Sequence, residues 1–176
     1  YPGGKLYPGY RVRLLRCEII DGVRISRVAL FPSHDRSAVR RVANYARFAI
    51  SATLYGVLFA RKFDVIYAYH PPLTVGLAAS LIRFFRQRPM VYDIQDLWPD
   101  TLAATGMLNN SRVLRWVDSA CRWVYSRAAH IAVLSPGFRS RLIARGVYAD
   151  KISVIYNWAD ERALALAVLP REESPA

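Results

Sequence analysis

Polar and aromatic side chains follow a short apolar run in the middle of the chain. The run Val91–Ile94 leads directly into Gln95, Asp96, Trp98 and Pro99. A carboxylate can take up a proton or stabilise positive charge, whereas a carboxamide only donates and accepts hydrogen bonds. Because Pro99 restricts the residue before it, Trp98 cannot relax into a helix. The segment therefore predicts a rigid loop, after a buried strand, that presents polar groups to a ligand.

A second candidate loop follows the apolar run Asp64–Tyr69. This run reads as a buried strand and leads into His70, Pro71 and Pro72, after which Thr74 opens a helix. Thr74 can cap the first amides of that helix, which is a natural position for an anion. His70 can bind a ligand, or it can be a hydrogen-bonded structural residue, as histidines at strand ends often are.

A third strand is expected at Ile131–Leu134, with His130 at its start. Ser135 follows it and can cap a helix over Gly137–Arg145, which Gly146 ends at a left-handed position.

The chain begins with a predicted β-hairpin. Arg11–Ile20 and Val23–Leu30 are extended, partly alternating runs joined at Asp21-Gly22. Both turn residues tolerate a positive φ, which the tight two-residue hairpin turns require.

One long helix is predicted over Ser37–Arg61. Residues at three- and four-residue spacing along it are Val39, Val42, Ala46, Ala49, Ile50, Thr53, Leu54 and Val57. This stripe packs on the core or, alternatively, rests on an anionic bilayer, with Arg40, Arg41 and Arg47 near the lipid phosphates.

Another amphipathic helix is predicted from Asn109–Ser111, which offer cap oxygens, to about Ala128. Its apolar stripe comprises Val113, Trp116, Val117, Ala120, Trp123 and Val124. We expect this stripe to pack against the sheet rather than bind a ligand. A last strand is expected at Ile152–Ile155, and a short helix at Glu161–Val168.

Composition limits the class of protein. The 176 residues, 53% of them hydrophobic, suffice for one domain with a substantial core. The formal net charge of +12, carried mainly by arginine, favours an anionic partner, although a solvated basic surface explains it equally well. Cys17 and Cys121 are too few for a disulfide scaffold and lack metal-ligand spacing, so we expect a reduced, cytosolic setting and no metal site.

Strands that alternate with helices predict an α/β fold. We expect a Rossmann-like parallel sheet with helices on both faces, preceded by the β-hairpin. The sequence has no GxGxxG, GxxxxGK[ST], HExxH, GxSxG or CxxC motif, which argues against the common dinucleotide, NTPase, zinc and serine-hydrolase sites. The longest uncharged apolar stretch, Phe48–Ala60, is too short to span a bilayer.

Three separated segments together resemble glycosyltransferase family 4. They are YHPPLTVG at Tyr69–Gly76, YDIQDLWP at Tyr92–Pro99, and Ala128–Asp160, which contains VLS and KISVIYN. Their order and spacing fit the family, and they are most similar to a bacterial surface-polysaccharide branch that includes N-acetylfucosamine transferases. The resemblance implies one half of the two-domain GT-B fold.

The resemblance also implies a domain organisation. Residues 1–160 correspond to the N-terminal, acceptor-side domain without its first strand and Gly-rich loop, and residues 161–176 to the start of the interdomain linker. Asn157 matches the hinge into a C-terminal domain that binds the donor. On this interpretation the chain is a fragment that is inactive alone.

The chemistry implied by the resemblance is retaining transfer of a sugar from a nucleotide donor to a lipid-linked or polysaccharide acceptor, with no metal or other cofactor. Many members have a histidine where this chain has Gln95, which can orient a hydroxyl but cannot act as a base. Asp96 is then the candidate catalytic carboxylate, unless it only caps its loop. The leaving phosphate is commonly thought to serve as base in this family. The other candidates for substrate binding are His70, Thr74, Trp98 and Ser135.

Two other functions stay open at this point. The first is a non-catalytic Rossmann-like module that uses its basic surface to contact a membrane or a protein. The second, a nucleic-acid binder, depends on charge alone without a recognisable reading motif, and we expect no nucleic-acid partner. The resemblance implies a cytoplasmic enzyme held peripherally at the inner face of the cytoplasmic membrane.

Overall fold

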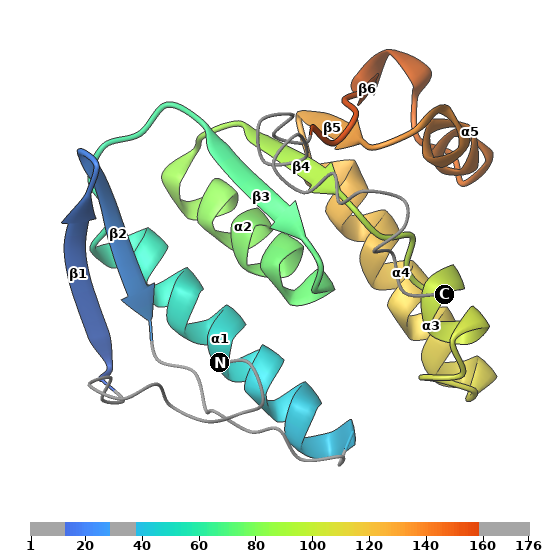
Figure 1. The fold of residues 1–176 in the computed structure, drawn as a ribbon, viewed down its shortest axis with the longest axis horizontal. Helices are drawn as coiled ribbons and strands as arrows, with labels where there is room; N and C mark the ends of the chain where they lie inside the picture. The colour runs from blue at the N-terminus through green and yellow to red at the C-terminus, as the bar shows by residue number, and fades with distance from the viewer. Residues whose placement is uncertain (1–12, 29–37, 159–176) are drawn as a thin grey trace, which may run out of the picture.

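The computed structural model describes residues 13–28 and 38–158, with side chains from residue 43 onward in the first long helix. Figure 1 shows a β-hairpin, a parallel sheet and the helices that flank it. The elements are β1 (Leu15–Ile20), β2 (Val23–Val28), α1 (Ala38–Leu58), β3 (Ile66–His70), α2 (Leu73–Arg86), β4 (Met90–Ile94), α3 (Asp100–Ala104), α4 (Ser111–Arg127), β5 (His130–Val133), α5 (Pro136–Ala144) and β6 (Ile152–Val154).

The sheet is parallel, with the strand order β3-β4-β5-β6. Right-handed crossovers that all advance in one direction place their helices on one face of the sheet. Accordingly Met90, Tyr92 and Ile94 are buried toward the helices, whereas Tyr67 and Tyr69 on the opposite face of β3 are exposed. The predicted α/β fold with a parallel sheet is confirmed. Within the described residues, however, α2, α4 and α5 cover one face only, not both.

The predicted hairpin is confirmed. Asp21 and Gly22 have φ values of 50° and 79°, so both turn residues adopt the left-handed conformation. Ser26 on β2 hydrogen-bonds the hydroxyl of Tyr55 on α1, with 2.6 Å between the oxygens. The hairpin thus lies against α1, which in turn runs alongside α2 (Figure 1).

The long helix is confirmed, but part of its predicted stripe does not pack on the core. Ile50, Leu54 and Leu58 are exposed, whereas Gly56 is buried against Ile82 of α2. The contact with α2 is made at Gly56 and Val57, whose carbonyls accept from Arg86 of α2 at 3.2 and 3.0 Å. The predicted helix at Glu161–Val168 lies outside the described residues.

The predicted stripe on α4 is also partly wrong. Asn110 caps the helix as expected, its side chain accepting from the amides of Arg112 and Val113. The buried residues are Cys121, Val124 and Tyr125, whereas Trp116 is 78% exposed. Within the predicted stripe, Val124 is buried and Val117 and Ala120 pack against the core, whereas Trp116 and Trp123 are exposed.

The cap predictions have mixed outcomes. Ser135 Oγ accepts from the Phe138 amide at the start of α5, and Gly146 has the left-handed φ expected after its end. Thr74 does not cap α2. The helix begins at Leu73, so Thr74 lies inside its first turn, and its hydroxyl is buried without a hydrogen-bond partner among the described residues.

Candidate functional site

His70, the last residue of β3, is buried in an aromatic setting. Its side chain is 2% exposed, and its ring meets the rings of Trp98 and Tyr92 edge-on, at centroid distances of 5.4 and 5.9 Å. Burial lowers the pKa of His70 to about 4, although the nearby carboxylate of Asp96 acts in the opposite direction. The imidazole is therefore neutral at pH 7, and Nδ1 has no partner among the described residues.

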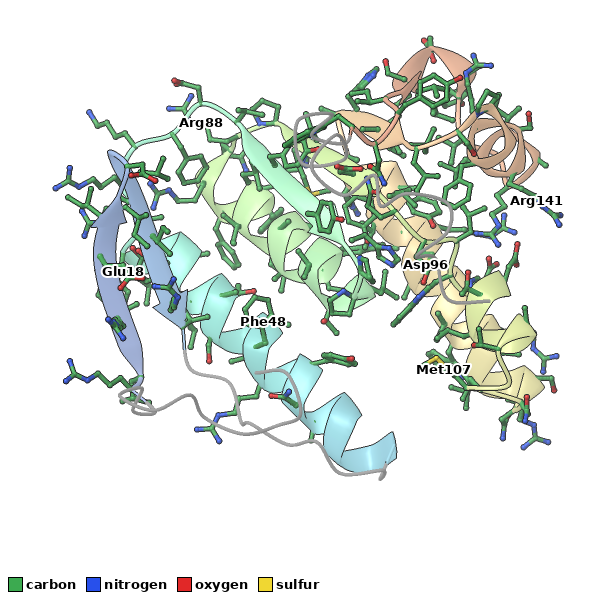
Figure 2. All side chains as sticks on the ribbon, viewed as in Figure 1. Glu18, Phe48, Arg88, Asp96, Met107 and Arg141 are labelled. Carbon is green, nitrogen blue, oxygen red and sulfur yellow. The ribbon has the colours of Figure 1, made fainter. Side chains whose placement is uncertain are left out.

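Asp96 lies just beyond the carboxyl end of β4 (Figure 2), and its own loop occupies both of its oxygens. The Trp98 indole nitrogen donates to Oδ2 at 3.0 Å, and the Thr101 hydroxyl donates to Oδ1 at 2.5 Å. These two donors tie the loop to the first turn of α3. This is the geometry of a loop-capping carboxylate, the alternative that the sequence left open.

Gln95 belongs to a second network, on the face of the sheet that points away from α2 and α4. Its amide Nε2 donates to Asp93 Oδ1 at 2.6 Å, and the Tyr67 hydroxyl donates to the other carboxylate oxygen. The hydrogen bond to Asp93 raises the pKa of Tyr67 to about 12. The Gln95 side chain is therefore held by Asp93 of β4 and not by the residues that follow it in the loop.

Arg145 ties the loop after β4 to the end of α5. Its Nη1 donates to the Trp98 carbonyl at 2.8 Å, and its Nη2 pairs with Asp100 Oδ1 at 2.6 Å. The guanidinium is mostly buried, with 12% of its side chain exposed. Two charge-assisted contacts from one guanidinium, one to a carbonyl and one to a carboxylate, fix the position of this backbone segment.

Comparison with known protein families decides the affiliation of this fold. The family described as glycosyl transferase 4-like domain matches residues 6–158. The chain belongs to this family. The match includes both loops described above and the whole parallel sheet.

Among solved structures, this glycosyl transferase 4-like domain is similar to HepE of Anabaena, whose crystal structure is a complex with UDP-glucose. The similarity has a TM-score of 0.42 with 18% sequence identity, and it covers 72% of this chain. The chain spans 30% of the length of HepE. No curated protein sequence matches the chain.

The domain brings some of the predicted site residues together. His70 contacts Trp98, Trp98 donates to Asp96, and Gln95 precedes them on the same loop. Ser135 caps α5 and Asn157 is exposed, and no interaction within the described part of the chain joins either of them to this cluster. The substrate-binding and hinge assignments therefore remain predictions.

Sequence reasoning missed four residues that hold the site: Tyr67, Asp93, Thr101 and Arg145. One signal was present, because Asp93 is an ionisable residue inside the central buried strand, where a carboxylate needs partners. The other three gave none. Their contacts depend on how distant segments meet.

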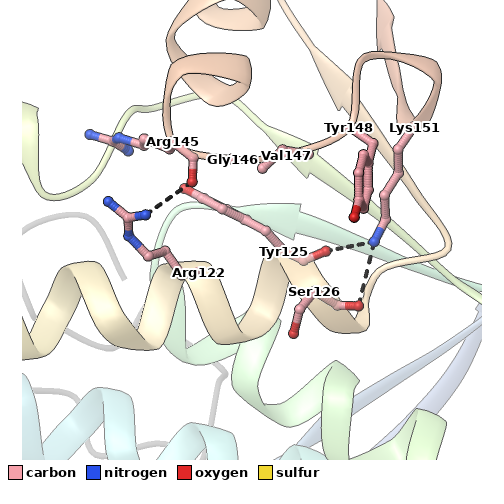
Figure 3. Close-up of a pocket in the computed structure, with 8 residues that line it drawn as sticks. All are labelled: Arg122, Tyr125, Ser126, Arg145, Gly146, Val147, Tyr148 and Lys151. Atoms are coloured by element: carbon pink, nitrogen blue, oxygen red, sulfur yellow. Dashed lines mark hydrogen bonds between the residues drawn. The ribbon is translucent and has the colours of Figure 1, made fainter.

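A separate pocket of about 240 Å³ lies between α4 and the loop that joins α5 to β6 (Figure 3). Lys151 donates to the carbonyls of Tyr125 and Ser126 at 2.8 and 3.4 Å, and Arg122 donates to the Arg145 carbonyl at 3.0 Å. Lys151 and Arg122 of this pocket therefore stabilise carbonyl groups at the C-terminal ends of α4 and α5. Over residues 13–28 and 38–158, no cluster of three potential metal-ligating side chains occurs.

Proposed function

We propose that this domain forms the acceptor side of an enzyme that transfers a sugar from a nucleotide donor to a lipid-linked or polysaccharide acceptor, with retention of anomeric configuration. The observation that carries the proposal is the family match over residues 6–158. The loop after β4, which Asp96 and Arg145 hold in place, supports the proposal, because ligands of such sheets bind at the carboxyl ends of the strands. Within this function, the N-acetylfucosamine transferase branch and bacterial surface-glycan synthesis are the more specific assignments we propose.

Each residue around the loop has its own role in the proposed transfer. Gln95 hydrogen-bonds a hydroxyl of the acceptor or of the transferred sugar, and neutral His70 borders the same site. Asp96 holds the loop in place, and its charge stabilises positive charge that develops on the sugar ring. The departing phosphate acts as base, so the chemistry needs neither metal nor other cofactor. Ser135 and Thr74 line the substrate side, and Asn157 is the hinge to a donor-binding domain.

We also propose that the enzyme attaches peripherally to the cytoplasmic face of an anionic membrane, where a lipid-linked acceptor is found. Exposed Ile50, Leu54 and Leu58 on α1 support this, since apolar side chains on a basic helix suit the lipid interface. None of the described helices is long and apolar enough to cross a bilayer.

A transfer assay on the complete enzyme tests the function. The protein is incubated with a panel of UDP-, GDP- and dTDP-sugars and bacterial lipid extract, and both nucleoside diphosphate release and labelled lipid are measured. We expect release that depends on the lipid and a product with the donor's anomeric configuration by NMR. A product with inverted anomeric configuration would contradict the retaining mechanism. Binding of nucleotide sugars without any transfer would contradict the proposed enzymatic function.

A non-catalytic binding module is the second candidate. It is favoured by one observation, the engagement of both Asp96 oxygens within the loop. In that case the complete protein would bind anionic vesicles or a partner protein through its basic surface while showing no lipid-dependent nucleotide release.

A further inference from the structure

Three side chains on the face of the sheet that points away from α2 and α4 form a continuous polar network. Tyr67 on β3 lies diagonally across the parallel pair from Asp93 on β4, whose register partner is Tyr69, and the Tyr67 phenol donates to one carboxylate oxygen. The other oxygen accepts from Gln95 Nε2 at 2.6 Å. Asp93 is only 8% exposed, so these two donors supply hydrogen bonds that water would otherwise make.

The network determines which end of the Gln95 amide faces outward. An ionised carboxylate only accepts hydrogen bonds, so Gln95 must turn its NH₂ group toward Asp93. The carbonyl Oε1 then points away from Asp93 and is the end left for a ligand. A hydrogen-bond acceptor in this position selects a ligand group that donates, such as a hydroxyl.

We propose that Asp93 and Tyr67 are positioning residues that lock the Gln95 amide so that Oε1 accepts a hydrogen bond from a sugar hydroxyl. This inference rests on the proposed glycosyl transfer. It adds two residues to the site and specifies which end of the Gln95 amide faces the sugar. Asp93 acts through Gln95, and Tyr67 acts through Asp93, so neither residue touches the substrate itself.

The first test measures the amide in the complete protein without any substrate. The side-chain NH₂ resonances of Gln95, assigned with Gln95→Ala, should shift in Asp93→Asn and, to a smaller extent, in Tyr67→Phe. Tyr69→Phe is the matched control, because Tyr69 is exposed on the same strand face and its hydroxyl has no hydrogen bond among the described residues. Unchanged Gln95 resonances in Asp93→Asn would overturn the positioning.

The second test asks whether exchanging the carboxylate of Asp93 and the carboxamide of Gln95 restores substrate binding. Asp93→Asn lets the Gln95 amide reverse and present NH₂, so KM for the glycan acceptor or for the nucleotide sugar should rise about tenfold with a smaller change in kcat, the size expected for one hydrogen bond. Combining Asp93→Asn with Gln95→Glu restores an acceptor at the same place and keeps the net charge, so KM should recover.

The outcomes separate this inference from the proposed function. A double variant no better than Asp93→Asn alone, with both variants folded by circular dichroism, would overturn the assigned polarity. Wild-type enzyme that transfers no sugar would overturn the proposed function, and the NMR shifts would then still decide whether Asp93 and Tyr67 orient Gln95.

Discussion

At the scale of single residues, the charge of Asp96 and its hydrogen bonds can be separated. Asp96→Asn removes the charge and one acceptor, whereas Thr101→Val removes the hydroxyl that donates at 2.5 Å and keeps the charge. If the charge acts in transfer, Asp96→Asn should lower kcat by about 10²-fold or more. Thr101→Val should lower stability by roughly 1 kcal/mol with kcat nearly unchanged. Steady-state kinetics and thermal melts of both variants measure the changes in kcat and in stability. Equal losses of kcat in the two variants would show that Asp96 only holds the loop in place.

His70 should make the stability of the fold depend on pH. Its folded pKa of about 4 lies below its ordinary value of 6.5, so between these values the unfolded chain binds a proton that the native state does not. The stability is complete above pH 6.5 and is lost as pH falls toward 4. The loss in the free energy of unfolding should approach roughly 3 kcal/mol.

Urea titrations between pH 7 and 5 measure this effect before most carboxylates protonate. His70→Gln should flatten the dependence, whereas His130→Gln, which removes a histidine bonded to Ser153 at 2.8 Å, should keep it. The same slope in wild type and His70→Gln would show that His70 is not the titrating group.

At the scale of elements, the approach of α2 to the sheet depends on one glycine. A Cβ at Gly76 would lie 2.8 Å from the Tyr92 ring and from a Val124 methyl group. Gly76→Ala should therefore lower the free energy of unfolding by about 1–3 kcal/mol through overpacking. Gly137→Ala on α5 is the control, because its Cβ would meet only Ser135 Oγ at 3.7 Å, and it should be neutral or slightly stabilising. Chemical denaturation of both variants is the measurement, and a stable Gly76→Ala would mean that α2 lies further from β4.

At the scale of the whole molecule, the net charge of +12 and the exposed stripe on α1 predict binding to anionic vesicles. Arg47 is exposed and lies two turns before Leu54 on the same side of α1. Replacing Arg40, Arg41 and Arg47 with alanine should weaken binding by about 1 kcal/mol per residue, together on the order of a hundredfold.

Sedimentation with phosphatidylglycerol vesicles measures the binding, which should also weaken as salt rises. An Arg88, Arg127 and Arg141 triple alanine variant is the control, because it removes the same charge from positions outside α1. Equal losses in the two triple variants would assign the binding to net charge and not to α1.

Local features were predictable because each depends on residues a few positions apart. The Asp21-Gly22 turn, the Ser135 cap and the glycine after α5 are all conformational preferences of short segments. The alternation of strands and helices likewise sufficed for a parallel α/β sheet, since crossovers of this kind permit few topologies. The order of the strands and of the longer helices could therefore be predicted from the sequence alone, as could the loop after β4 as a candidate site, whereas the short helix α3 was not predicted.

Only the tertiary structure decided how that site is held. Tyr67 and Asp93 are 26 positions apart, and Trp98 and Arg145 are 47 positions apart. Such contacts depend on strand register and on the tilt of α5, which no local preference encodes. The same applies to the exposed Ile50 and Leu54 on α1 and to Trp116 on α4, because helical spacing alone does not decide which residues of a stripe pack against α2 or the sheet.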